Sequence, residues 1–239
     1  MDTLCSEKLP TSLDDSGGRT VAKKRIGVLL SGCGVFDGAE IHEATLTLFF
    51  LDRAGAEAIC MAPDMAQHHV INHITGQEMP ESRNVLIESA RIARGNIRNL
   101  ATVQVADVDA VILPGGFGAA KNLSTVAFAG PQAQVDPTVA AFLRGVQEAG
   151  KPIGALCISP AVISRIFADQ GLTLTIGTDP GTAGAIAAMG NRHQESAVDA
   201  IVVDQAHKIV TSAAYMCAAS IGEVGQGIEK LVAEVLRQA

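Results

Sequence analysis

Short apolar runs alternate along the chain with longer segments whose apolar residues have helical spacing. Apolar runs of about three to seven residues, bounded by glycine, proline or polar residues, are typical of strands buried in a parallel sheet. They predict strands at residues 26–30, 56–62, 110–113, 152–156, 173–176, 201–203 and 208–210. The intervening segments predict helices at residues 38–53, 82–94, 137–149, 160–167, 182–189 and 216–237. Strands that alternate with helices build βαβ units, so the pattern predicts an α/β fold with a parallel sheet covered by helices.

The two ends of this pattern set the expected domain. Residues 1–24 are polar and hold no apolar run, so we expect a disordered tail. They include four acidic residues, which argues against an acid-poor transit peptide. Residues 25–239 show neither an internal linker nor a repeat, and we expect them to form a single domain.

Composition narrows the class of protein. Of the 239 residues, 48% are hydrophobic and only 3% aromatic, so the core is expected to be aliphatic. The net charge of −7 argues against nucleic acid as a partner. Since no run of 18 apolar residues occurs, we expect no membrane-spanning segment.

The cysteines indicate a reducing compartment. The chain has five, an odd number, and no Cys-x-x-Cys motif, which favours free thiols over disulfides or a zinc site. No signal peptide precedes them, so the expected location is the cytoplasm. The adjacent His68 and His69 have the wrong spacing for two ligands on one helix face, and we expect no metal and no other cofactor.

Ligands of open α/β sheets bind beyond the carboxyl ends of the strands. In this chain those ends are rich in glycine, proline and polar residues, and we expect them to meet in one pocket. They are residues 31–34, 114–116, 157–159 and 177–179.

Cys157 and Glu43 are the candidate catalytic residues. Cys157 follows a predicted strand and precedes a predicted helix, so we expect it to face the pocket beside a positive helix end that lowers its pKa. On position alone it is equally a nucleophile or a buried structural cysteine. Either Glu40 or Glu43 is expected to face the same pocket. An acidic residue at a helix start is also explained without any site, because it interacts favourably with the helix dipole.

Two long motifs carry a resemblance to a known family. Residues 26–43 (IGVLLSGCGVFDGAEIHE) and 111–124 (VILPGGFGAAKNLS) resemble the ElbB branch of the ThiJ/PfpI superfamily, which is class I glutamine amidotransferase-like. Proteins of this branch were once called isoprenoid biosynthesis proteins and later glyoxalases. Further matching stretches extend the resemblance over nearly everything after residue 25; they are 70–76, 83–98, 151–160, 174–179 and 201–215.

The resemblance implies both a fold and an activity. It implies a flavodoxin-like, doubly wound, mostly parallel sheet with helices on both faces, usually in a homodimer. It also implies a cofactor-independent glyoxalase that converts a small dicarbonyl such as glyoxal to a 2-hydroxy acid. The family's nucleophile falls on Cys157, its acid–base carboxyl falls on Glu43, and its oxyanion-binding amides fall on Gly115, Gly116 and Ile158.

One departure from the superfamily pattern bears on mechanism. Many members supply a histidine to the cysteine, whereas here Ile158 follows Cys157 and the loop at 177–180 has no histidine. His73 or Asp179 could serve as an accessory group. Without a full triad, a cysteine-based redox sensor or binding module and an amidotransferase-like partner protein remain alternatives. Nucleotide binding at the glycines of residues 32–38 is disfavoured by the carboxylates that follow them.

Overall fold

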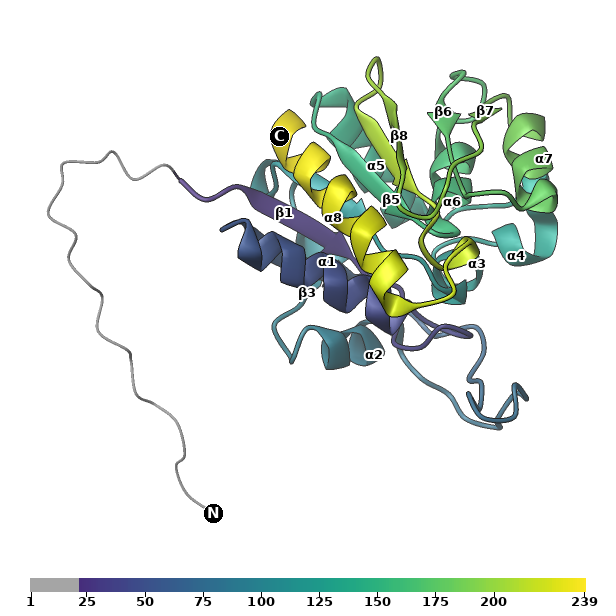
Figure 1. Cartoon of the computed structure of the whole chain (residues 1–239). Coiled ribbons are helices and arrows are strands. Elements are labelled where there is room, and N and C mark those ends of the chain that lie inside the picture. Colours follow the sequence, from purple (N-terminus) through teal and green to yellow (C-terminus); the bar gives the residue numbers. More distant parts are fainter. Residues whose placement is uncertain (1–21) are drawn as a thin grey trace, which may run out of the picture.

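A central sheet runs through the molecule in the computed structural model, which describes residues 22–239 (Figure 1). Its strand order within this range is β3-β2-β1-β4-β5-β9-β8. Every neighbouring pair is parallel except β8 with β9, which is antiparallel. In chain order the strands are β1 (Arg25–Leu29), β2 (Glu57–Ala62), β3 (Arg98–Asn99), β4 (Ala110–Leu113), β5 (Ile153–Leu156), β8 (Ile201–Asp204) and β9 (Ile209–Ser212).

Helices cover both faces of this sheet. The longer ones are α1 (Ile41–Arg53), α2 (Val85–Ile92), α5 (Pro137–Glu148), α6 (Ser159–Ile166), α7 (Pro180–Ala188) and α8 (Ile221–Gln238). Short helices are α3 (Phe117–Lys121) and α4 (Val126–Ala129), and 3₁₀ turns are η1 (Leu100–Thr102), η2 (Val105–Asp107), η3 (Gly130–Gln132) and η4 (Ala214–Met216). Helices α1, α2 and α8 pack in one apolar cluster, and α3, α5, α6 and α7 pack in the other. The structure confirms the flavodoxin-like α/β fold.

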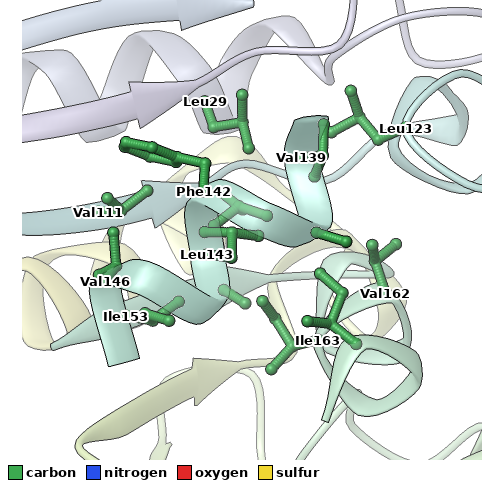
Figure 2. Packing of buried hydrophobic residues seen from close by; sticks show 14 of the residues in the cluster. Leu29, Val111, Leu123, Val139, Phe142, Leu143, Val146, Ile153, Val162 and Ile163 are labelled. Atoms are coloured by element: carbon green, nitrogen blue, oxygen red, sulfur yellow. The ribbon is translucent and has the colours of Figure 1, made fainter. Parts of the chain in front are cut away.

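The core is aliphatic, as the composition predicts. Alternate residues of a strand face opposite sides of the sheet, so Val28 and Leu29 belong to different clusters. Figure 2 shows Leu29 of β1 and Val111 of β4 in one group of buried side chains with residues of α5 and α6, such as Phe142 and Val162. Leu143 and Ile163 are among the fully buried residues of that face.

One predicted strand lies outside the main sheet. Residues Thr173–Leu174 form β6, which pairs only with β7 (Arg192–His193) in a separate two-stranded sheet. The outer flank of β9 is already taken by the antiparallel β8, so the backbone N–H of Thr173 donates to the Asp204 carboxylate instead (2.8 Å). The segment 177–179 therefore does not follow a strand of the main sheet.

Helix starts differ from the predicted ones for identifiable reasons. The first helix begins at Ile41 because Glu40 is its N-cap and Gly38 packs against the preceding loop. The last helix begins at Ile221, and residues 214–216 form the separate turn η4. Most of the expected tail at 1–24 lies outside the described residues. Within residues 22–239, no helix combines the length and apolar character needed to cross a membrane.

Candidate active site

Cys157 occupies a sharp turn between β5 and α6. Its φ of 59° lies in the left-handed region, which is strained for any residue with a side chain. The turn is held by the backbone N–H of Cys157, which donates to the carbonyl of Ser212 at the end of β9 (3.0 Å). The side chain is buried, with 8% of the residue exposed. The thiol thus sits at the carboxyl ends of the central strands, where the sequence places it.

Glu43 reaches the thiol from the first turn of α1. The N-cap Glu40 accepts a hydrogen bond from the backbone N–H of Glu43 (2.7 Å) and so fixes this turn. The Glu43 carboxyl is fully buried and lies beside the Cys157 thiol: a Cβ atom on Gly115 would be 2.7 Å from Glu43 Oε2 and 3.0 Å from the Cys157 sulfur. Its two oxygens also accept from the N–H groups of Gly115 (2.8 Å) and Tyr215 (3.2 Å). Of the two candidate carboxyls, Glu43 is therefore the one at the sulfur, and Glu40 is the cap.

Position 115, in the loop after β4, requires glycine. A Cβ atom on Gly115 would lie 2.4 Å from Cys157 Cβ and 2.7 Å from Glu43 Oε2, so a side chain would separate the thiol from the carboxyl. Gly116 has a φ of 93°, which glycine adopts readily. The N–H groups of Gly116 and Ile158 lie near the Cys157 sulfur and favour its ionised form. The three predicted amides therefore have two roles. The Gly115 N–H donates to Glu43, whereas the N–H groups of Gly116 and Ile158 lie at the sulfur.

Burial dominates the electrostatics of the pair. It raises the pKa of Glu43 to about 7, assisted by the negative charge of Glu40 and opposed by the N–H groups of Gly115 and Tyr215. Burial, together with the charge of Glu43, also raises the pKa of the Cys157 thiol well above its ordinary value, against the N–H groups at the sulfur. The prediction of a lowered thiol pKa is wrong, since two acidic groups are desolvated side by side. Ionised Glu43 can instead act as a base for the thiol.

Sequence reasoning singled out neither Tyr215 nor His42. Tyr215 lies in η4, just beyond β9, and its backbone N–H is one of the donors to Glu43. Its hydroxyl lies 2.7 Å from His42 Nδ1, and His42 directly precedes Glu43 in α1. Two signals in the sequence could have identified the residue. Tyr215 is the only tyrosine of the chain, and it follows the carboxyl end of a predicted strand.

The two accessory candidates lie elsewhere in the fold. His73 Nε2 accepts from the backbone N–H of Phe36 (3.3 Å) and is 3.8 Å from the Asp37 carboxylate, so His73 holds the loop after β1. Asp179 caps α7 and accepts from the N–H of Thr182 (2.7 Å). Within residues 22–239, no hydrogen bond joins either of them to Cys157 or Glu43.

Little of Cys157 is exposed. Two surface hollows, of about 390 and 430 Å³, are lined by residues around Lys151 and Arg165 and do not include Cys157. In the described part of the chain, no three side chains of His, Cys, Asp or Glu gather as a metal-binding group. The small exposed fraction of Cys157 favours small reagents.

Known proteins with similar sequences extend over most of the chain. The DJ-1/PfpI family model matches residues 33–221. The glutamine amidotransferase-like class 1 domain-containing protein 3, mitochondrial, of Homo sapiens is 44% identical over 92% of this chain and 90% of its own length. The ES1 protein homolog, mitochondrial, of Rattus norvegicus is 45% identical over 90% of this chain and 84% of its own length.

Solved structures agree with these matches. An isoprenoid biosynthesis protein with an amidotransferase-like domain from Ehrlichia chaffeensis superposes with a TM-score of 0.83 at 35% identity, covering 90% of this chain and all of that chain. The DJ-1beta protein of Drosophila melanogaster has the same fold, with a TM-score of 0.54 at 20% identity over 91% of this chain and 96% of that chain. From its sequence and its fold, the chain belongs to the DJ-1/PfpI family.

Proposed function

We propose that the protein is a cofactor-independent glyoxalase of the ElbB type, which converts glyoxal-type dicarbonyls to 2-hydroxy acids. One observation carries the proposal: the buried Glu43 carboxyl lies beside the Cys157 thiol, with the N–H groups of Gly116 and Ile158 near the sulfur. It supports the proposal because a nucleophile, a proton-transfer group and anion-stabilising donors would then share one buried site. The small exposed fraction of Cys157 suits a two-carbon substrate.

The first step makes a covalent adduct. Ionised Glu43 takes the thiol proton, and the sulfur of Cys157 bonds to an aldehyde carbon of glyoxal. The electron pair of the carbonyl moves to its oxygen, where the N–H groups of Gly116 and Ile158 stabilise the developing charge. Protonation of that oxygen gives a hemithioacetal.

The second step moves a proton between the two carbons. Glu43 removes the hydrogen of the carbon that bears sulfur, and a proton is returned to the neighbouring carbon through an enediol. The product is a thioester with a hydroxymethyl group. Water then cleaves the carbon–sulfur bond, which releases glycolate and restores the thiol. One carbon is oxidised while the other is reduced, so glyoxal and water give glycolate without an external oxidant.

Glycolate formation from glyoxal by the purified protein tests the proposal. We expect turnover in the wild type and in Cys60→Ala, whose cysteine lies in β2 within the core, and none in Cys157→Ala. Glu43→Gln is expected to lose turnover as well, because it cannot accept the thiol proton. Equal turnover in wild type and Cys157→Ala would refute the assignment.

The contacts around the sulfur also admit a second function. A sulfinate on Cys157 would find N–H donors at Gly116 and Ile158 and a protonated carboxyl at Glu43, as a redox sensor requires. Oxidation and the glyoxalase reaction both need the thiolate, which the raised thiol pKa disfavours until Glu43 takes the proton. Selective oxidation of Cys157 by dilute peroxide, seen by mass spectrometry in a protein without dicarbonyl turnover, would favour the sensor.

The expected homodimer and location remain predictions. Light scattering of the purified protein distinguishes a dimer from a monomer. The cytoplasm is the location that the free cysteines suggest, while the human and rat relatives have names that place them in mitochondria. Both compartments keep thiols reduced, and cell fractionation separates the two possibilities.

A further inference from the structure

A hydrogen-bonded pair of ring side chains is joined to Glu43 through the main chain. His42 Nδ1 and the Tyr215 hydroxyl are 2.7 Å apart, and the ring centroids are separated by 5.8 Å. His42 is exposed and Tyr215 is half-buried, so solvent reaches the pair. It joins the first turn of α1 to η4, two elements that are far apart in the sequence.

Main-chain contacts join this pair to the Glu43 carboxyl. The backbone N–H of Tyr215 donates to Glu43 Oε1, and His42 is the residue before Glu43. The carboxyls of Glu40 and Glu43 both influence the phenol, and together with burial they raise the pKa of Tyr215. From α8, the Glu223 carboxylate is committed to the N–H of Ala219 (2.8 Å). Among the described residues, Glu40 and Glu43 are therefore the charged groups whose state influences the Tyr215 phenol.

The proposed reaction needs one more proton donor than Cys157 and Glu43 provide. Glu43 is occupied with the carbon-bound proton at the moment when negative charge develops on the second carbonyl oxygen. The N–H groups of Gly116 and Ile158 face the sulfur and serve the first oxygen. The histidine that many superfamily members place beside the cysteine is replaced here by Ile158. A donor for the second oxygen must come from another element.

Resting on the proposed glyoxalase function, we infer that Tyr215 and His42 form the acid pair that protonates the second carbonyl oxygen of the dicarbonyl. The Tyr215 O–H bond breaks and its proton passes to that oxygen, which becomes the hydroxyl of the product. His42 then passes a proton to the phenolate through Nδ1 and takes one from solvent. The first oxygen loses its proton to solvent when the thioester forms, so one proton enters from solvent and one returns to it.

Tyr215→Phe isolates the hydroxyl, because phenylalanine retains both the ring and the backbone N–H that donates to Glu43. We expect kcat for glyoxal to fall about 10²-fold, the usual contribution of a general acid, with KM unchanged. His42→Asn should lower kcat less and change the shape of its pH profile. The control is His68→Asn, which removes an exposed histidine outside the site and should leave both constants as in the wild type.

A spectroscopic readout separates proton transfer from a merely structural role. Tyr215 is the only tyrosine and the chain has no tryptophan, so the ultraviolet absorbance of tyrosinate reports this residue alone. We expect His42→Asn to shift the pH at which tyrosinate forms, and Cys157→Ala to keep a tyrosinate signal while losing turnover. An active wild type whose kcat is unchanged in Tyr215→Phe would overturn this inference alone. A wild type without glycolate formation would overturn the proposed function, and the inference with it.

Discussion

Glu43 should make the stability of the protein depend on pH. Its carboxyl is fully buried, and its pKa is raised from 4.5 to about 7. One pKa unit corresponds to about 1.4 kcal/mol, so burial of the ionised carboxyl costs the fold about 3 kcal/mol. Glu43→Gln removes the ionisation while keeping nearly the same volume, and is the perturbation of choice.

The sign follows from where the proton is bound. Below the ordinary carboxyl pKa of 4.5, both the folded and the unfolded chain carry the proton and no penalty arises. Between 4.5 and about 7 the unfolded chain ionises first, so the folded state binds more protons and stability falls as pH rises. Above about 7 both states are ionised, and the full loss of about 3 kcal/mol is reached.

Urea unfolding at a series of pH values measures this effect directly. The free energy of unfolding of the wild type, minus that of Glu43→Gln, should fall by about 3 kcal/mol from about pH 4 to about pH 8. Substituting Gln also changes the hydrogen bonds to Gly115 and Tyr215, but that contribution is independent of pH. The same pair of measurements in a Cys157→Ala background removes any coupling to the thiol. A pH-independent difference would refute a raised pKa for Glu43.

Two further substitutions test the site and its surroundings. Gly115→Ala should abolish glyoxal turnover and lower the free energy of unfolding by about 1–3 kcal/mol, because the new methyl group would lie 2.4 Å from Cys157 Cβ. The matched control is Gly184→Ala in α7, where a Cβ atom meets open space, and it should raise the free energy of unfolding. Steady-state kinetics measures the turnover of both variants, and urea unfolding measures their stability. Asp179→Ala should lower the free energy of unfolding by about 1 kcal/mol through loss of the α7 N-cap, with unchanged turnover. A loss of turnover in Asp179→Ala would instead indicate that Asp179 takes part in the reaction.

The order of strands and helices could be predicted from the sequence, because short aliphatic runs bounded by glycine and proline form few structures other than buried strands. The position of Cys157 follows from the same argument, since the run before it forms β5 and Pro160 lies in the first turn of α6. The strand at 173 does not join the main sheet, because β8 already covers the edge strand β9. Nothing in the residues of that run reveals this, so the prediction that it joins the sheet is wrong.

The electrostatics of the site could not be predicted from local sequence. A helix end beside Cys157 suggests a lowered thiol pKa, but the outcome depends on the depth of burial and on Glu43, more than 100 residues away. Tyr215 escaped notice for a related reason. Its contact with Glu43 is made by the backbone, so the side chain at that position gives no signal of it.

The left-handed backbone at Cys157 has a consequence for the evolution of this fold. The turn is closed by a main-chain hydrogen bond from residue 157 to Ser212, which needs no sulfur. A non-glycine residue at a φ of 59° is held there at a cost of about 1–3 kcal/mol, which glycine would relieve. A lineage that stopped using the thiol would therefore gain stability by drifting to glycine at this position. A strained cysteine at this position is what we expect where a residue serves chemistry at the expense of scaffold stability.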